Sequence, residues 1–152
     1  METERPSSNK NVLVAIAAGV IILGLAVVFQ KGSPASGPAG KPAIFSQVAY
    51  EQALAANKTD GKLLLVKLTA EWCGPCKLMN KEAFVDPGVI DTIRDAGTAI
   101  EVDIDQHGDV ATQLGVQAIP TMVLYKNGTE QSRNTGYMSA DELREWIAKA
   151  KG

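Results

Sequence analysis

The sequence predicts an α/β fold in which a central mixed β-sheet lies between helices, and three observations lead to it. Segments with strand and helix character alternate from about residue 44 to the end of the chain. The segment Leu63–Thr69 (LLLVKLT) is almost continuously apolar, as expected for a central strand covered on both faces. Asn127-Gly128 is a strong two-residue hairpin turn, so only the last two strands can pair through a tight turn.

The first half of this domain is predicted to contain a helix, a strand and two further helices. Ser46–Asn57 has helical character, and Gly61 ends the turn before the strand. The helix that follows Trp72 should turn its apolar side chains inward, namely Cys76, Met79 and Phe84. Asp86 is a suitable N-cap for the next helix, Pro87–Ala96, because proline is favoured at the first helical position.

The second half is predicted to alternate strands and helices. Ala99–Asp103 alternates like a strand, and Asp109–Leu114 forms a short helix. Thr121–Lys126 is a further strand, and the strand after the hairpin turn runs to about Asn134. Ser139–Glu142 is a capping box that starts the last helix, whose apolar residues share one face: Leu143, Trp146 and Ile147.

The composition limits the possible partners and cofactors. The chain has 152 residues and a formal net charge of -2, which gives no reason to expect a nucleic-acid partner. Its two cysteines and one histidine, Cys73, Cys76 and His107, are too few for a structural zinc site, which normally takes four ligands. A catalytic zinc with three protein ligands would require His107 beside the cysteine pair. We expect no metal, and we expect His107 to lie exposed at the start of a short helix.

The N-terminal part of the chain predicts a membrane anchor. Asn11–Gln30 contains no charged residue and lies between Lys10 and Lys31. A helix of this length spans roughly 30 Å, the hydrocarbon thickness of a bilayer. The length favours a retained anchor, although small residues at 33–35 leave a cleaved signal peptide as the alternative. Residues 1–10 would then form a short cytoplasmic head, with the rest of the chain exported.

A Gly/Pro/Ser-rich stretch, residues 31–43, predicts a flexible linker, because such a composition buries too little apolar surface to fold. It separates the anchor from a single domain at 44–152. We therefore expect a single-pass protein of the cytoplasmic membrane with a periplasmic or other extracytoplasmic domain. Basic residues on both flanks of the anchor favour this orientation only slightly.

The motif Cys73-Gly74-Pro75-Cys76 lies between a buried strand and a helix, the context in which a CxxC pair carries redox chemistry. The thiolate is the reactive form, and the helix start favours negative charge on Cys73. The first, more exposed sulfur would attack a substrate disulfide, and Cys76 would resolve the mixed disulfide. The alternative is a structural disulfide, but a bridge across two intervening residues contributes little to folding.

Three motifs, in this order, resemble the thioredoxin family over essentially all of residues 44–151: Ala70–Lys77 (AEWCGPCK), Ala118–Thr121 (AIPT) and Tyr125–Gly128 (YKNG). The resemblance implies the thioredoxin fold, a Cys73–Cys76 redox disulfide, a monomer and no cofactor. It implies that Pro120, which from sequence alone could equally be trans, is cis and faces the cysteines. The residues that it implies at the substrate are Trp72, Gly74, Pro75, Ile119 and Pro120; for Trp72 the alternative is simple packing at the rim.

A narrower resemblance involves Lys81–Val89 (KEAFVDPGV). This stretch is similar to the membrane-linked thiol:disulfide interchange proteins, in particular the C-terminal thioredoxin-like domain of DsbD. That group works outside the cytoplasmic membrane and passes electrons to other exported thiol proteins. The resemblance implies an upstream membrane electron donor and protein thiols or disulfides as partners.

Lys67 departs from the thioredoxin pattern. It stands where the family carries a buried carboxylate that assists proton transfer at the second cysteine. Because it lies in the strand that leads to the motif, we expect its side chain to be partly buried. A positive charge retained there would lower the pKa of a nearby thiol and make the pair more oxidising than thioredoxin. Alternatively, Lys67 reaches solvent and has no chemical role.

The sequence therefore predicts an anchored thiol–disulfide oxidoreductase with Cys73 as nucleophile and Cys76 as resolving thiol. Gly-Pro between the cysteines resembles reductants more than strong oxidants, which favours a reductase. Two alternatives have the same fold. One is a membrane-tethered module that binds peptides in the Pro120 groove without catalysis, and the other is a dedicated reductant of apocytochrome c cysteines.

Overall fold

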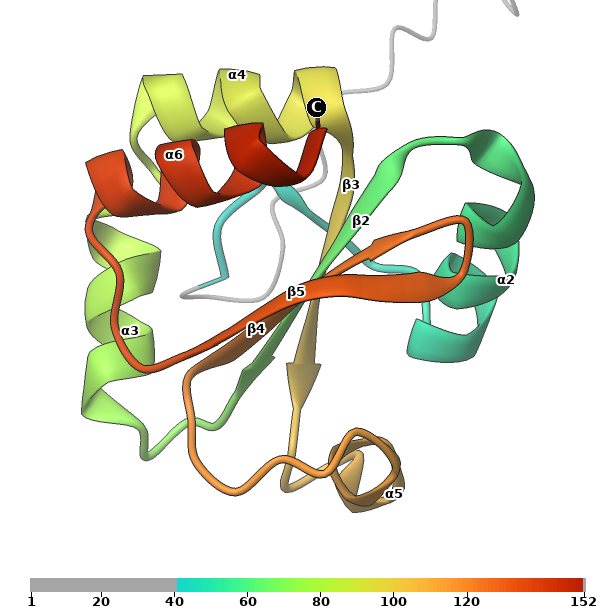
Figure 1. Cartoon of the computed structure of the whole chain (residues 1–152). Helices are drawn as coiled ribbons and strands as arrows, with labels where there is room; N and C mark the ends of the chain where they lie inside the picture. Colours follow the sequence, from blue (N-terminus) through green and yellow to red (C-terminus); the bar gives the residue numbers. More distant parts are fainter. Residues whose placement is uncertain (1–40, 152) are drawn as a thin grey trace, which may run out of the picture. The chain divides into compact units, whose positions relative to one another are not determined.

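The structure is a computed structural model that describes residues 41–151 (Figure 1). The elements are, in chain order, β1 (Phe45–Ser46), α2 (Tyr50–Asp60), β2 (Leu63–Thr69), α3 (Gly74–Lys81), α4 (Pro87–Ala96), β3 (Gly97–Asp103), α5 (Gly108–Gln113), β4 (Thr121–Lys126), β5 (Thr129–Thr135) and α6 (Ala140–Lys151). The strands form one sheet in the order β1-β3-β2-β4-β5. β1 and β2 are parallel to β3, whereas β4 is antiparallel to both β2 and β5. The predicted α/β class with a mixed sheet is confirmed.

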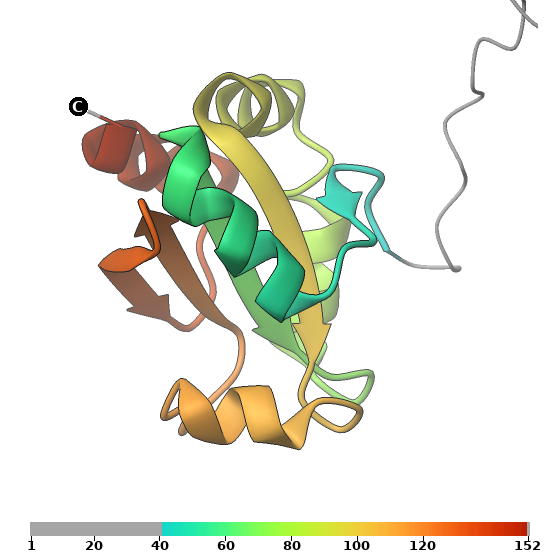
Figure 2. The same ribbon diagram turned by 90° about the vertical axis from the view of Figure 1, so that its right-hand side faces the viewer.

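Strand β2 is the centre of the domain, and all of its residues are buried because helices cover both faces of the sheet (Figure 2). On the face that we call the α2/α5 face, its even-numbered side chains pack against those two helices: Leu64, Val66 and Leu68. On the opposite face, the α3/α4/α6 face, Leu63 and Leu65 pack against the other three helices. Lys67 follows the same alternation and also points to the α3/α4/α6 face.

Three local signals form as predicted. The Asp86 carboxylate accepts a hydrogen bond from the backbone N–H of Val89 (3.0 Å) and caps α4. At the start of α6 the Ser139 N–H donates to the Glu142 carboxylate (2.8 Å), and the Glu142 N–H donates to the Ser139 hydroxyl (3.4 Å), which is a capping box. Asn127 and Gly128 both have positive φ and connect β4 to β5. These boundaries could be predicted from the sequence because each depends on a few neighbouring residues.

The first helix begins at Tyr50 rather than at the predicted Ser46. The chain before it forms the short strand β1, in which Phe45 and Ser46 pair with β3. Two residues are too few to show a strand pattern, and Ala49, the N-cap of α2, makes no side-chain capping bond. Helix α3 ends at Lys81, so the inward-pointing Phe84 lies in the turn after it.

Gly97 begins β3 and pairs with Leu63, the first residue of β2. The two backbones approach so closely that a Cβ on Gly97 would collide with the Leu63 carbonyl oxygen. Only glycine fits there, and the contact fixes a register that continues to the pairing of Thr69 with Asp103.

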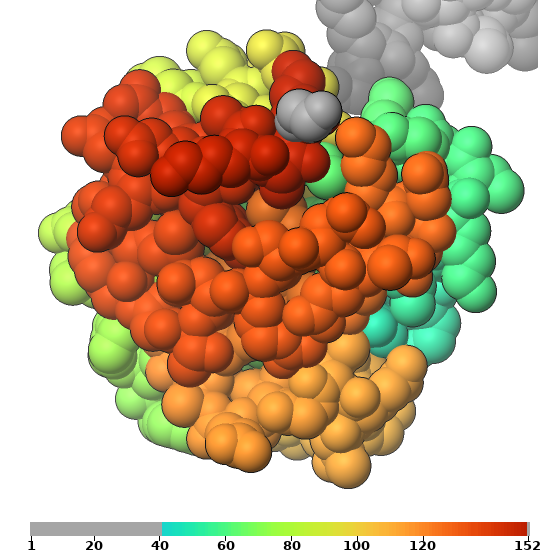
Figure 3. All heavy atoms as spheres, viewed as in Figure 1, coloured from blue at the N-terminus to red at the C-terminus, as the bar shows by residue number. Residues whose placement is uncertain are grey.

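At the other edge of the sheet, β5 carries mostly polar, exposed side chains, and Figure 3 shows it at the surface between α6 and α5. An exposed polar edge is a common protection against further strand pairing. The predicted head (1–10), anchor (11–30) and most of the linker (31–43) lie outside the described residues. Within residues 41–151, no helix has the length and apolar character needed to span a bilayer.

Candidate active site

The two cysteines lie where β2 leads into α3. The Cys73 N–H donates a hydrogen bond to the Ala70 carbonyl (3.1 Å), which turns the chain toward the helix. Cys73 is the N-cap of α3, and its Sγ accepts a hydrogen bond from the backbone N–H of Cys76 (3.2 Å). The first N–H groups of a helix have no partner within the helix. The Cys73 sulfur therefore occupies a place where negative charge is favoured.

Cys73 and Cys76 form a disulfide, so the structure describes the oxidised pair. Their Cα atoms are 5.3 Å apart. Cys73 is 3% exposed and Cys76 is 1% exposed, because both pack with Ala70 under Ile104 and Ile119. Apolar side chains from two neighbouring segments thus cover both cysteines in the oxidised form, and Cys73 is only marginally the more exposed of the two.

A second loop, before β4, completes the site. The Ile119–Pro120 peptide bond is cis, as the thioredoxin resemblance implies. Two hydrogen bonds hold this loop: the Gly136 N–H donates to the Pro120 carbonyl (2.8 Å), and the Thr121 hydroxyl donates to the Ala118 carbonyl (2.7 Å). Ile119 packs against the apolar cluster around the two cysteines. The fold thus brings together the two motifs that the sequence separates.

Trp72, Gly74 and Pro75 form the exposed rim of the motif. The Trp72 side chain is 67% exposed, and its indole N–H donates to the Asp105 carboxylate (2.9 Å). A Cβ on Gly74 would meet no atom within 4 Å, so the surface is open at this residue. An exposed indole held by one hydrogen bond offers apolar area to an approaching polypeptide.

Lys67 is fully buried (0% exposed) rather than partly buried as predicted. Its Nζ donates to Glu101 Oε2 (2.7 Å) and to Asn80 Oδ1 (2.6 Å), and the Asn80 amide donates to the same Glu101 oxygen (3.2 Å). The alternative in which Lys67 extends to solvent is therefore wrong. The side chain stays inside because a carboxylate on the neighbouring strand and an amide on α3 both bind the ammonium there.

Burial lowers the pKa of the Lys67 ammonium, because desolvation penalises its charged form. The Glu101 carboxylate opposes this lowering through its charge and its hydrogen bond. The positive charge of Lys41 adds to the lowering by a smaller amount. Lys67 and Glu101 thus form a buried salt bridge in which the carboxylate partly offsets the cost of burying the ammonium.

Three residues that support the site were not found from the sequence: Asn80, Glu101 and Asp105. For Glu101 a signal existed, since opposite charges stand in two strands that were both predicted. Reading it requires the strand order and register, which pair Lys67 with Glu101. For Asn80 the signal was its spacing of four residues from Cys76, which places both on one helix face.

His107 is exposed and is the N-cap residue of α5, as predicted. In the described part of the chain, no group of three or more His, Cys, Asp or Glu side chains is arranged to hold a metal ion.

A disulfide across two intervening residues stabilises a fold little. Its position at a helix start, beside a cis-proline loop and open space, instead suits repeated formation and cleavage of the bond. This arrangement defines the class of the protein as a dithiol–disulfide oxidoreductase.

Comparisons with known proteins identify the family. The family model described as Thioredoxin matches residues 41–149. The thioredoxin of Chlamydia muridarum (strain MoPn / Nigg) is 34% identical over 106 residues, which cover 70% of this chain and 95% of that protein. Thioredoxin H2-1 of Oryza sativa subsp. japonica is 32% identical over 129 residues, which cover 82% of this chain and 90% of that protein. The crystal structure of thioredoxin NaTrxh from Nicotiana alata matches with a TM-score of 0.61 and 31% identity, covering 76% of this chain and 100% of that chain.

The chain belongs to the thioredoxin family. It is a thioredoxin-type thiol–disulfide oxidoreductase that acts on protein disulfides. The thioredoxin fold that the sequence motifs imply is confirmed. The narrower resemblance to membrane-linked interchange proteins stays a prediction.

Proposed function

We propose that this chain is a membrane-tethered protein-disulfide reductase whose catalytic domain works outside the cytoplasmic membrane. The observation that carries the redox part is the Cys73–Cys76 disulfide at the start of α3, beside the cis Ile119–Pro120 loop. The Gly-Pro pair between the cysteines supports the reducing direction.

Cys73 is the nucleophile, because its sulfur caps the helix start, and Cys76 is the resolving thiol. The Cys73 thiolate attacks one sulfur of a substrate disulfide, the substrate S–S bond breaks, and one half leaves as a thiolate. Cys76 then loses its proton to water and attacks Cys73 Sγ, which releases the second half as a thiolate. The Cys73–Cys76 bond now exists and two electrons have passed to the substrate. An upstream dithiol donor in the membrane must return them.

The substrate peptide lies along the rim formed by Trp72, Gly74, Pro75 and the Ile119–Pro120 loop. Pro120 has no N–H, and its carbonyl already accepts a hydrogen bond from Gly136. Because Pro120 offers no N–H, we expect a peptide that pairs with this loop to use the backbone of Ile119. The rim is open at Gly74, the residue that follows Cys73.

Residues 11–30 serve as the anchor, residues 31–43 as the tether and residues 1–10 as the cytoplasmic head. The uncharged length of 11–30 and the basic residues that flank it support this assignment. A tethered domain meets its partners at the membrane surface, which suits a monomer that receives electrons from a membrane donor and passes them to exported thiol proteins.

The catalytic part is tested by insulin-disulfide reduction with the full chain. Cys73→Ser should reduce the rate to background. Cys76→Ser should instead accumulate mixed disulfides with substrate proteins, because no second thiol resolves them. Full biological activity of Cys73→Ser in cells would show that the chain is a peptide-binding module rather than a reductase. If the trapped partners are apocytochromes alone, the dedicated apocytochrome c reductant is the correct function.

The membrane part is tested separately by protease access in intact cells. An exported domain should be cleaved by added protease once the outer barrier is opened, whereas the head at 1–10 should stay protected. Recovery of the domain in the soluble fraction would contradict the tether and leave the redox chemistry unaffected.

A further inference from the structure

Lys67, Glu101 and Asn80 form a buried polar cluster that takes no direct part in the proposed reaction. The strand register places Lys67 opposite Glu101, and Asn80 reaches both from α3. Over residues 41–151, no buried side-chain nitrogen or oxygen lacks a hydrogen-bond partner. Each polar side chain of the cluster therefore has a hydrogen-bond partner. The question is why a charged pair is buried at this place.

Stability does not explain the Lys67–Glu101 pair. The ammonium lies 5.5 Å from the centre of the Phe45 ring and 5.2 Å from that of the Phe84 ring, in otherwise apolar surroundings. These rings contribute a favourable cation–π interaction. Even so, removing an ammonium from water costs several kcal/mol, and an apolar pair of similar volume is often as stable or more stable.

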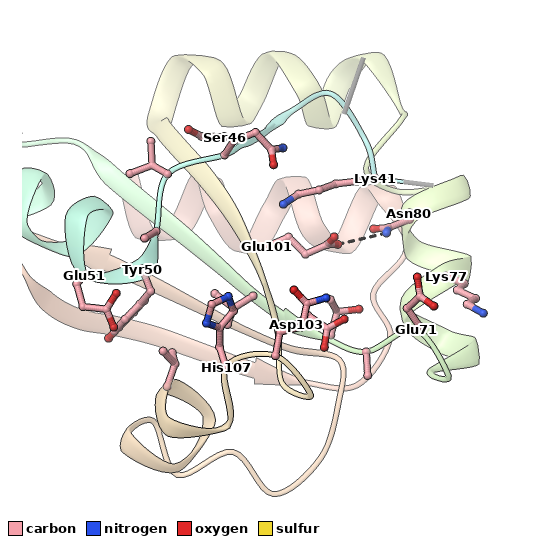
Figure 4. Close-up of a pocket in the computed structure, with 18 of the residues that line it drawn as sticks. Lys41, Ser46, Tyr50, Glu51, Glu71, Lys77, Asn80, Glu101, Asp103 and His107 are labelled. Atoms are coloured by element: carbon pink, nitrogen blue, oxygen red, sulfur yellow. Dashed lines mark hydrogen bonds between the residues drawn. The ribbon is translucent and has the colours of Figure 1, made fainter. Parts of the chain in front are cut away.

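The two ends of the pair differ in their contact with water. The Glu101 side chain is 10% exposed and lines a groove of about 640 Å³, together with Asn80 and Lys41 (Figure 4). The Lys67 ammonium is sealed from solvent. Water in the groove screens the carboxylate more than the ammonium. Of the two charges, the positive one is therefore the less screened.

Asn80 connects this positive end to the helix of the dithiol. Cys76 and Asn80 are four residues apart in α3, which places their Cβ atoms roughly 6 Å apart on one helix face. Lys67 Nζ lies 2.6 Å from Asn80 Oδ1. Asn80 therefore links the ammonium to the helix face that carries Cys76. The other charged side chains that line this groove are partly or fully exposed, so solvent screens them: Lys41, Glu51, Glu71, Lys77, Lys81 and Asp103. Asp105, which binds Trp72, is exposed as well.

We propose that Lys67 and Glu101 are positioning residues of the redox site, and that the sealed positive end of their pair favours the thiolate form of the reduced dithiol. The inference rests on the dithiol roles proposed above. In the equilibrium considered, the protein dithiol and oxidised glutathione give the Cys73–Cys76 disulfide and two reduced glutathione molecules. A stabilised thiolate favours the reduced protein. The domain is thus a weaker reductant than the same fold with the pair reversed.

The decisive variant reverses the pair: Lys67→Glu with Glu101→Lys, in the full chain. The combined side-chain length and the ion pair are kept, so a purely structural role predicts no change at the cysteines. We expect the thiol pKa, followed by thiolate absorbance, to rise by about one unit, which is about a tenfold loss of thiolate near neutral pH. The glutathione equilibrium should shift toward the protein disulfide.

A neutral pair, Lys67→Met with Glu101→Gln, keeps the test decisive if the reversed pair does not fold. Its thiol pKa should lie between those of the wild type and the reversed pair. Lys77→Gln is the matched control, because this exposed lysine follows Cys76 directly and should shift the pKa much less.

The outcomes separate this inference from the proposed function. Equal thiol pKa values in the wild type and the folded variants, with glutathione exchange intact, would overturn the inference alone. A shift in Lys77→Gln as large as in the reversed pair would also overturn it. Failure of the wild-type dithiol to exchange with glutathione would instead overturn the proposed function.

Discussion

The two faces of β2 hold their buried polar groups in different ways. On the α2/α5 face, the hydroxyls of Tyr50 and Tyr125 lie 3.4 Å apart, and both groups are neutral. On the α3/α4/α6 face, Lys67 and Glu101 form a salt bridge. A paired hydroxyl costs little to bury, whereas an ammonium costs several kcal/mol. The buried group that costs most, the Lys67 ammonium, thus lies on the face against which α3, the helix of the dithiol, packs. The comparison indicates that the tyrosine pair serves packing, whereas the lysine charge serves the chemistry of the site.

The largest loss in the free energy of unfolding is expected when the Lys67–Glu101 pair loses one partner. Glu101→Leu leaves the Lys67 ammonium buried without its carboxylate, and we expect a loss of about 4 kcal/mol in the free energy of unfolding at pH 7. The loss should shrink as pH rises, because the lysine pKa, already lowered in the folded state, then falls further and unfolding takes up a proton.

Urea denaturation at several pH values measures this effect. The control is Glu130→Gln, which breaks the exposed pair with Arg133 and should cost less than about 1 kcal/mol. Equal losses in the two variants would show that burial of the Lys67 pair has no energetic consequence.

A cavity on the α2/α5 face should affect stability without affecting the chemistry. Leu64→Ala removes a buried side chain of β2 and is expected to cost about 3 kcal/mol. The thiol pKa and the glutathione equilibrium should not change, because no charge moves. A changed thiol pKa in this variant would contradict the view that only the α3/α4/α6 face affects the chemistry of the cysteines.

The smallest effect is expected at the tyrosine pair. Burial raises the pKa of Tyr125 well above its ordinary value, so at alkaline pH the folded state keeps a proton that the unfolded state loses. Stability should therefore fall as pH rises above about 10, the ordinary tyrosine value. Tyr125→Phe should cost about 1 kcal/mol near neutral pH through the lost hydrogen bond. It should also flatten the alkaline fall, and an unchanged alkaline profile would contradict this origin.

Much of the fold was predictable because its signals are local. The apolar run of β2, the Asp86 cap, the Asn127-Gly128 turn and the Ser139 capping box each depend on a few adjacent residues. The cysteine pair was predictable for the same reason, since the motif and its strand-to-helix context are contiguous. β1 was missed because its two residues are held only by their partner strand.

The surroundings of the site could not be predicted because they depend on register between distant segments. The sequence shows a lysine before the motif but not whether a carboxylate faces it. Glu101 becomes that partner only through the parallel pairing of β2 with β3, and Asn80 only through the packing of α3 on the sheet. Asp105 similarly reaches Trp72 across a long sequence separation.

The close contact at Gly97 determines which substitutions the chain tolerates at this position, in addition to the register of β3. Any side chain there would push β3 away from Leu63, and a slip of one residue would turn Glu101 to the opposite face of the sheet. Lys67, four residues along β2 from this contact, would then lose its carboxylate. In a genetic screen for defective electron transfer, substitutions at codon 97 should therefore be recovered beside those at the cysteines, although this residue touches neither sulfur.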